Sequence, residues 1–295
     1  MSEPETWTIG RLLQWTTQFL KDRGADSPRL DAEVLLAHAL GCPRIALYTR
    51  FEEQPSEAVR ASFREAVKQR SKGMPVAYLV GQREFYSLPF RVSPDVLIPR
   101  PETEFLLIRL LDLAKQQQPA EGETFTVADV GTGSGILAVC AAKHLPTCRV
   151  TAVDTSAAAL KVARQNAADH GVAAKIEFVE SDLLAGVPAN RRFDFIVSNP
   201  PYVTTAEMEQ LMVDVRKFEP RAALEAGPQG TEVIERLLPQ AAERLVLGGW
   251  LLLEISPQLN AAVRQLIESD GRFELAPTMK DLAGHARVVS ARRRG

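Results

Sequence analysis

The chain has 295 residues, 45% of them hydrophobic and 24% charged, which excludes a disordered or fibrous protein and predicts one large domain or two unequal ones. The formal net charge of −2 argues against a protein whose main partner is bulk nucleic acid, because such proteins carry a strongly basic face. No apolar run reaches the roughly 18 residues that cross a bilayer, so we expect no membrane-spanning segment.

The first 80 residues predict helices alone. Thr8 precedes a run with apolar residues at helical spacing, which ends at Gly24. Ser27-Pro28 begins a second helix, and Gly41 closes it. A third helix is predicted from about 56 to 72. Because no β-rich stretch interrupts these segments, we expect a small all-helical domain.

From about residue 84 the pattern changes to alternating apolar residues, interrupted by Pro89 and by Ser93-Pro94. This pattern predicts a short hairpin or an extended linker. We therefore divide the chain into a helical domain over 1–83, a hairpin linker over 84–98, and a larger domain over 99–295 as the candidate catalytic domain.

Beyond residue 99, short apolar strands alternate with helices. Strands are predicted at Phe125–Val130, Arg149–Val153, Lys175–Val179, Phe193–Ser198, Trp250–Ile255, Phe273–Leu275 and Arg287–Ser290. Helices are predicted at Thr103–Gln117, Gly135–His144, Ala157–His170, Thr231–Val246 and Gln258–Ser269. The alternation predicts an α/β fold with a parallel sheet covered on both faces. Ligands of such sheets bind outside the carboxyl ends of the strands.

A glycine-rich loop, Asp129-Val130-Gly131-Thr132-Gly133-Ser134-Gly135, joins the first of these strands to a helix. Its glycines permit a tight backbone and leave no Cβ between the loop and a ligand, although an ordinary tight turn stays open as an alternative. No Gly-Lys-Ser/Thr follows, so the loop is no P-loop. A dinucleotide would place its pyrophosphate here, where the Asp129 carboxylate would repel it. The carboxylate suits the cationic amino group and sulfonium of S-adenosylmethionine, which we therefore expect rather than NAD.

Two further acidic residues follow the next two strands. Asp154 is placed to accept hydrogen bonds from both ribose hydroxyls of a nucleoside. Its alternative role is to cap the following helix. Asp182 is placed to meet an adenine amino group, or else lies in a solvated loop. Three acidic strand ends behind one glycine loop favour the nucleoside interpretation.

The sequence Asn199-Pro200-Pro201-Tyr202 follows the strand ending at Ser198, and its two prolines make the turn rigid. An amide or aromatic amine nitrogen is a poor nucleophile because its lone pair is delocalised. The side-chain carbonyl of Asn199 and the backbone carbonyl of Pro200 can each accept one N–H of such an NH₂ group, orienting the nitrogen and stabilising its developing positive charge. The Tyr202 ring can stack on the planar group. The motif predicts methylation of a planar nitrogen, against the alternative of an ordinary proline turn.

These residues resemble the HemK-type protein-(glutamine-N5) methyltransferases, which modify the Gly-Gly-Gln loop of peptide chain release factors. The likeness extends over nearly the whole chain. Besides the glycine loop and the Asn-Pro-Pro-Tyr turn, it includes Tyr78-Leu-Val-Gly-Gln-Arg-Glu-Phe-Tyr-Ser-Leu-Pro-Phe90, Leu97-Ile-Pro-Arg-Pro-Glu-Thr-Glu104, Phe218-Glu-Pro220 and Asp281-Leu-Ala-Gly-His-Ala-Arg-Val-Val289. The resemblance implies a Rossmann-like, seven-stranded S-adenosylmethionine-dependent methyltransferase fold with an all-helical N-terminal domain that docks the protein substrate.

The resemblance also implies roles for individual residues. The cofactor is expected to be bound by Gly131–Gly135, Asp154 and Asn199, and the substrate glutamine by Asn199–Tyr202. Relatives often carry an aromatic residue after the third acidic strand end, to cover the adenine, but this chain has Leu183 there. Arg100 is expected to line the mouth of the site. Glu102 or Glu104 is expected to cap the next helix, and the role of Glu219 stays open.

The implied reaction is methyl transfer from S-adenosylmethionine to the side-chain N5 of the glutamine in release factors. Two alternatives carry the same chemistry. Enzymes that methylate a glutamine of a ribosomal protein share the domain plan, but their segment before the glycine loop reads Pro-Arg-Ser-Pro instead of Pro-Arg-Pro-Glu-Thr-Glu. DNA adenine-N6 methyltransferases share Asn-Pro-Pro-Tyr but flip their base and carry a basic recognition domain. A non-catalytic scaffold would have a degraded loop or lack Asn199.

The three cysteines, Cys42, Cys140 and Cys148, form no Cys-x-x-Cys motif or Cys/His cluster, so we expect neither disulfides nor a bound metal. The first residues are acidic and lack the basic-then-apolar order of a secretory signal. These features predict a cytoplasmic protein. We expect a monomer whose partner is a release factor and which binds neither a membrane nor a specific nucleic acid sequence.

Overall fold

A computed structural model describes residues 6–117 and 124–295. Within these ranges the chain forms two compact units. The first comprises residues 6–82 together with Val213–Phe218, and the second comprises the described residues of 83–212 and 219–295. Among the described helices none is both long and apolar enough to cross a membrane.

The first unit is helical, as predicted. Its helices are α1 (Ile9–Lys21), α2 (Pro28–Leu40), α3 (Ala46–Thr49), α4 (Glu57–Arg70), α5 (Val76–Val80) and α9 (Val213–Phe218). The Thr8 hydroxyl accepts a hydrogen bond from the Arg11 amide at 3.2 Å and so caps α1. Helices α3, α5 and α9 were not predicted, because four to six residues are too few to show a helical period. Trp15 of α1 is 50% exposed, although it is one of the large apolar residues of this helix.

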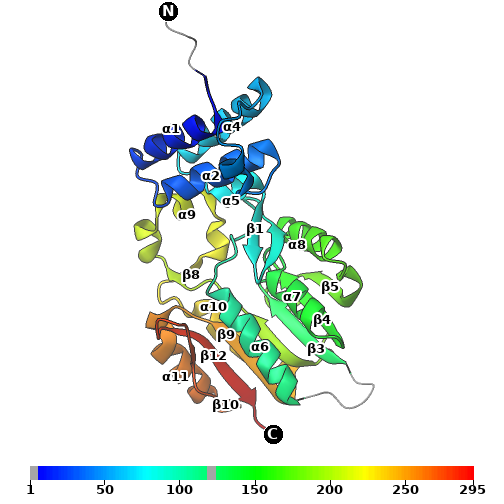
Figure 1. Cartoon of the computed structure of the whole chain (residues 1–295). Coiled ribbons are helices and arrows are strands. Elements are labelled where there is room, and N and C mark those ends of the chain that lie inside the picture. The colour runs from blue at the N-terminus through cyan, green and yellow to red at the C-terminus, as the bar shows by residue number, and fades with distance from the viewer. Residues whose placement is uncertain (1–5, 118–123) are drawn as a thin grey trace, which may run out of the picture. The chain divides into compact units, whose positions relative to one another are not determined.

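The second unit is built on a sheet with helices on both faces (Figure 1). The strand order is β10-β12-β9-β6-β3-β4-β5, with the short β11 paired to β12. The strands are β3 (Phe125–Val130), β4 (Cys148–Asp154), β5 (Ile176–Glu180), β6 (Phe193–Ser198), β9 (Leu245–Glu254), β10 (Phe273–Leu275), β11 (Met279–Lys280) and β12 (Ala286–Arg293). The longer helices are α6 (Thr103–Gln117), α7 (Ile136–His144), α8 (Ala157–Asp169), α10 (Glu232–Arg244) and α11 (Asn260–Asp270). The seven-stranded methyltransferase architecture is thus confirmed.

The sheet is parallel, as expected, except at one edge. Strands β9, β6, β3, β4 and β5 are parallel, but β12 runs antiparallel to both β9 and β10. No long helix separates β10 from β12, and a parallel neighbour would need such a crossover.

Both faces of the central strands are buried, and alternate residues of each strand enter different cores. Val127 and Phe195 pack with residues of α6 and α7, whereas Ala128 and Ile196 pack with residues of α10 and α11. This period of two, with apolar residues on both faces, explains why the strands are continuous hydrophobic runs.

Short elements complete the second unit. A hairpin joins β1 (Gln82–Phe85) to β2 (Leu88–Arg91), and a second two-stranded sheet pairs β7 (Val203–Thr204) with β8 (Glu225–Gly227). The remaining 3₁₀ turns are η1 (Ala173–Lys175), η2 (Glu207–Gln210), η3 (Arg221–Ala223) and η4 (Pro257–Leu259).

The order of the strands reverses beside β3. The chain proceeds from β3 to β4 and β5 on one side, then returns to β6 on the other side of β3. The carboxyl ends of β3 and β6 therefore border the switch point, where ligands of open α/β sheets bind. The glycine loop follows β3 and the Asn-Pro-Pro-Tyr turn follows β6, so the topology brings the two motifs together.

Candidate active site

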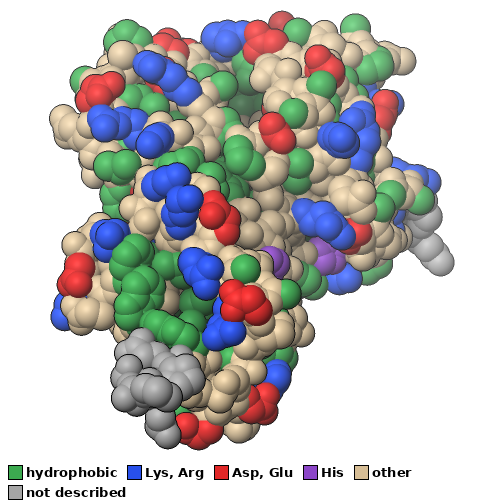
Figure 2. Space-filling view, turned by 90° about the horizontal axis from the view of Figure 1, so that it is seen from above, with side chains coloured by type: hydrophobic (Ala, Val, Ile, Leu, Met, Phe, Trp, Pro, Cys, Tyr) green, Lys and Arg blue, Asp and Glu red, His purple; other side chains and the backbone are tan. Residues whose placement is uncertain are grey.

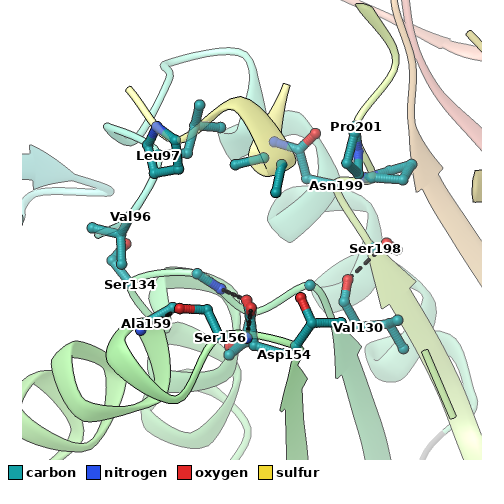
Figure 3. A pocket seen from close by; sticks show the side chains of 18 of the residues that line it. Val96, Leu97, Val130, Ser134, Asp154, Ser156, Ala159, Ser198, Asn199 and Pro201 are labelled. Atoms are coloured by element: carbon teal, nitrogen blue, oxygen red, sulfur yellow. Dashed lines mark hydrogen bonds between the residues drawn. The ribbon is translucent and has the colours of Figure 1, made fainter. Parts of the chain in front are cut away.

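A cavity of about 360 Å³ lies at this switch point. In Figure 3 the labelled residues ring it, with Ser134, Ser156 and Asp154 on one side and Asn199 and Pro201 on the opposite side. The predicted site residues that line it are Arg100, Gly131, Thr132, Gly133, Ser134, Asp154, Asp182, Leu183, Asn199, Pro200 and Pro201. Asp129, Gly135 and Tyr202 are not among its described lining residues.

Asp129 supports the glycine loop from beneath, and its side chain does not face the cavity. It is 1% exposed, and its Oδ2 accepts hydrogen bonds from the Thr132 hydroxyl at 2.6 Å and from the Ala138 amide at 3.0 Å. The second bond satisfies a free amide in the first turn of α7. Burial raises the pKa of this carboxyl to about 7. The contact predicted between Asp129 and a cationic cofactor is therefore replaced by a structural role.

The loop needs glycine for two separate reasons. Gly131, Gly133 and Gly135 have φ values of +75°, +54° and +81°, in the left-handed region that favours glycine. In addition, a Cβ on Gly135 would lie 3.0 Å from the Cβ of Ala163 and 3.2 Å from its Cα, so α7 and α8 approach closely there. Gly135 thus contributes helix packing, whereas the other two glycines border the cavity.

We expect Gly135→Ala to destabilise the protein more than Gly171→Ala. Gly171 has a similar φ of +71°, but a Cβ there would meet no described atom within 4 Å. The left-handed backbone alone costs about 1–2 kcal/mol for alanine, and the crowding at Ala163 adds about 1–3 kcal/mol. Urea denaturation of both variants measures the difference. Equal free energies of unfolding would show that the close approach is easily relieved.

Asp154 holds the loop in place from the end of β4. Its Oδ2 accepts a hydrogen bond from the Gly133 amide and its Oδ1 one from the Ser156 amide, both at 2.9 Å. The cap of α8 is Ser156, whose hydroxyl accepts from the Ala159 amide at 3.1 Å, so the capping alternative for Asp154 was wrong. A carboxylate has about four lone-pair sites, and Asp154 retains two for a ligand in the cavity.

Asp182 and Leu183 lie on the side of the cavity that follows β5. The Asp182 carboxylate forms an ion pair with Arg236 of α10, which also lines the cavity and was not singled out from sequence. Both side chains are 56% exposed. Leu183 has φ +51° and is 8% exposed. A left-handed backbone is costly for leucine, so the surrounding packing holds Leu183 against the cavity.

The Asn-Pro-Pro-Tyr turn is anchored at Asn199 and at Ser198, the residue before it. The Ser198 hydroxyl donates to the Val130 carbonyl at 2.7 Å, which ties β6 to β3 just before the turn. The Asn199 Nδ2 donates to the Thr103 hydroxyl at 3.2 Å. Burial raises the pKa of Tyr202 to about 12, with the nearby Glu254 as the second cause, so the phenol stays protonated.

The segment before α6 is held by a buried glutamate. The Glu219 carboxylate, with a side chain 1% exposed, pairs with Arg100 at 2.5 Å and accepts from the Ile98 amide at 3.1 Å. This contact gives Phe218-Glu-Pro220 a role that the sequence left open. Glu104 lies in the first turn of α6, as predicted for a residue at the helix start, and also accepts from the Tyr86 amide at 2.9 Å in the hairpin turn; Glu102 lies 3.8 Å from Arg287.

Solved methyltransferases share this architecture. A methyltransferase of Pyrococcus furiosus superposes with a TM-score of 0.51 at 20% identity, over 72% of this chain and 91% of its own. The 16S rRNA N2 G1207 methyltransferase of T. thermophilus, solved in complex with AdoMet and guanosine, has a TM-score of 0.51 at 22% identity. The match covers 72% of this chain and 50% of that one. Identities this low show the fold alone, and the fold is that of the α/β methyltransferases.

Sequence comparison places the chain within that class. Residues 11–81 match the family model described as the PrmC N-terminal domain, and residues 104–227 match the methyltransferase small domain. A release factor glutamine methyltransferase of Rhodopirellula baltica is 48% identical over 98% of this chain and 97% of its own. Another, of Koribacter versatilis, is 41% identical over 97% of this chain and 99% of its own. This chain belongs to the release factor glutamine methyltransferase family.

The methyl donor of this family is S-adenosylmethionine, and the cavity fits it. A Cβ on Gly133 would meet none of the described atoms within 4 Å, so the missing side chain leaves open space beside the loop. Asp154 keeps unused acceptor sites for hydroxyl groups, and Leu183 gives an apolar contact surface. The volume of about 360 Å³ lies within the ordinary range for ligand cavities.

Proposed function

We propose that the protein methylates the side-chain N5 of the glutamine in the Gly-Gly-Gln motif of peptide chain release factors. The observation that carries this proposal is the position of Asn199 and Pro200 on the edge of the cofactor cavity, after the strand beside the switch point. Relatives that are 48% and 41% identical over nearly their full length bear the name release factor glutamine methyltransferase.

The chain's residues divide the work of the reaction. Bound S-adenosylmethionine supplies an electrophilic methyl group on a sulfonium. Asp154 and the loop amides position the cofactor, while the Asn199 Oδ1 and the Pro200 carbonyl accept the two N–H bonds of the substrate amide. Both oxygens stabilise positive charge that develops on the nitrogen as it attacks. Pro201 and Tyr202 keep the turn rigid and apolar.

Mass spectrometry tests the proposal directly. The protein is incubated with labelled S-adenosylmethionine and either a purified release factor, a ribosomal-protein preparation, or duplex DNA. We expect one methyl group on the glutamine of the Gly-Gly-Gln loop and none in the other two samples. Methylation of a ribosomal-protein glutamine or of adenine with an unmodified release factor would overturn the proposal.

We also propose that the helical unit docks the release factor. A groove of about 310 Å³ lies between α1 and α4. Its residues are Trp7, Leu12, Trp15, Thr16, Phe19, Arg60, Phe63, Arg64, Val67 and Lys68. Trp15 stacks on Phe19 at 4.8 Å between ring centroids. Aromatic residues and arginines are the side chains that most often dominate protein–protein binding energy, which supports a docking role.

Trp15→Ala is expected to lower kcat/KM for the intact release factor by about tenfold, the effect of losing one moderate hot-spot contact. Activity on a short peptide that carries Gly-Gly-Gln should be unchanged, because the peptide lacks the folded surface of the release factor that would dock in the groove. Ile45→Ala is the matched control, since Ile45 is 72% exposed on the same unit and lies outside the groove. Equal losses on peptide and intact factor would contradict docking at this groove.

We propose, finally, that the protein works as a cytoplasmic monomer without a specific nucleic acid partner. The net charge of −2 supports this, as do the three free cysteines, of which Cys140 and Cys148 are buried. Figure 2 shows acidic and basic side chains interspersed over the face it presents, without the single-sign field that attracts nucleic acid.

A further inference from the structure

A short chain of buried polar groups lies behind Asn199. Thr103, the first residue of α6, is 1% exposed, and Glu254, the last residue of β9, is 2% exposed. The Thr103 hydroxyl lies close enough to the Glu254 carboxyl to lower the pKa of that carboxyl, and the Asn199 Nδ2 donates to the Thr103 Oγ1 at 3.2 Å. The Glu254 Oε2 has no hydrogen-bond partner among the described residues. Glu254 therefore contacts the active turn through Thr103.

The direction of these hydrogen bonds sets the orientation of the Asn199 amide. An ionised carboxylate is only an acceptor, so a hydrogen bond between the two groups uses the single proton of the Thr103 hydroxyl. The Thr103 oxygen is then left as an acceptor for Asn199, which must present its NH₂ to Thr103 and keep its Oδ1 for another partner. The reversed amide would place an acceptor against an acceptor at Thr103 and leave a buried NH₂ group unpaired, which is costly.

This orientation matters for the reaction, because a substrate NH₂ group needs an acceptor. An Asn199 side chain that presented its own NH₂ to the substrate would repel it. Glu254 is held in place by the sheet. It is the last residue of β9, which pairs with β6, and its neighbour Leu253 pairs with Ser198. The sheet that carries the turn thus also carries the group that orients it.

We propose that Glu254 and Thr103 are positioning residues for methyl transfer, which fix the Asn199 side chain with its Oδ1 toward the substrate amide. The proposal rests on the proposed function. It names the two residues that make Asn199 present a hydrogen-bond acceptor to the substrate. Neither side chain needs to touch the substrate. We call the series Glu254–Thr103–Asn199 the relay. Loss of the relay should lower turnover while the cofactor still binds.

The charge state of Glu254 gives the relay a pH dependence. Burial, the main cause, raises the pKa of this carboxyl to about 7. The charged and titratable groups around it are Glu102, which raises the pKa further, Arg100 and Arg287, which lower it, and the phenol of Tyr202. Protonated Glu254 can donate to Thr103 and release its hydroxyl proton toward Asn199, which permits the reversed amide. Turnover should therefore fall as the pH falls through about 7.

The first test replaces the middle of the relay. Thr103→Val is isosteric and removes the hydroxyl, whereas Thr103→Ser keeps it. We expect Thr103→Val to lower kcat on the release factor about tenfold or more, with the KM for S-adenosylmethionine within about twofold, and Thr103→Ser to restore most of the turnover. Thr126→Val is the matched control, because the Thr126 hydroxyl also donates to a carboxylate, that of Asp194, at 2.7 Å. Both residues lie near the amino ends of β3 and β6, whereas the cavity lies at the carboxyl ends. Wild-type turnover in Thr103→Val overturns the proposal.

The second test measures the pH profile of kcat for Glu254→Gln beside the wild type, with Asp194→Asn as the control. The kcat of the wild type should fall as the pH falls through about 7, and Glu254→Gln should lack this acidic decrease because an amide does not titrate. If Thr103→Val fails to fold, this profile alone decides. An identical acidic limb in Glu254→Gln and the wild type overturns the relay. A wild-type protein that does not methylate release factors overturns the proposed function instead.

Discussion

Replacing Asn199 with alanine is expected to lower kcat for release factor methylation by about 10²–10³-fold, the usual loss when one preorganised polar group is removed from a reacting centre. Without Oδ1 the substrate amide keeps only the Pro200 carbonyl as acceptor, so its nitrogen is less well aligned with the methyl group. The dissociation constant for S-adenosylmethionine, measured by calorimetry, should change only several-fold. The loss would therefore appear in kcat.

A remote asparagine provides the control for this substitution. Asn260 lies in α11, where its Oδ1 accepts from the Thr278 hydroxyl at 2.9 Å, and it does not line the cavity. Asn260→Ala removes a comparable hydrogen bond and should leave kcat unchanged. If Asn199→Ala retained more than about a third of the wild-type kcat, the Oδ1 acceptor would have no part in catalysis.

The second large effect is expected at the end of β4. Asp154→Ala removes the hydrogen bond from the Gly133 amide of the loop, the one from the Ser156 amide before α8, and the acceptor sites left for the ribose. Hydrogen bonds to charged groups contribute about 1.5–3 kcal/mol each, so the cofactor dissociation constant should rise by roughly 10–100-fold. At saturating cofactor, kcat should return to within several-fold of the wild type.

Asp169→Ala is the matched variant for that measurement. The Asp169 carboxylate also has two partners, Arg91 and Gln165, but it lies on the exposed side of α8 and does not line the cavity. Exposed ion pairs contribute little to stability, so cofactor binding should be unaffected. A rise in the dissociation constant of similar size in both variants would indicate a general loss of stability, and would count against Asp154 as a cofactor ligand.

The sequence predicted the central sheet well, because strands buried on both faces are short and continuously apolar. The predicted bounds of Phe125–Val130 and Phe193–Ser198 agree with the structure residue for residue. The glycine loop and the Asn-Pro-Pro-Tyr turn were located correctly at the cavity, since the ends of such strands meet at one edge of a sheet. The strand β12 was predicted, but its antiparallel direction was missed, because a strand's direction leaves no mark on its composition.

The direction in which individual side chains point was harder to predict. Asp129 lies one residue before the end of β3, beneath the glycine loop, where it accepts hydrogen bonds from Thr132 and Ala138, whereas Asp154 is the last residue of β4 and lines the cavity. Thr103 and Glu254 lie far from the turn in sequence and belong to no short motif, so only the fold brings them beside Asn199. Arg236 likewise reaches the cavity from a helix whose pattern shows only its packing face.

The most direct test is a crystal structure with S-adenosylhomocysteine and a peptide that carries Gly-Gly-Gln. We expect the thioether sulfur in the cavity beside Gly131–Ser134, and the glutamine side-chain nitrogen at about 2.9 Å from both the Asn199 Oδ1 and the Pro200 carbonyl oxygen. A glutamine nitrogen held by other groups, with both of these oxygens beyond about 3.5 Å, would contradict the mechanism.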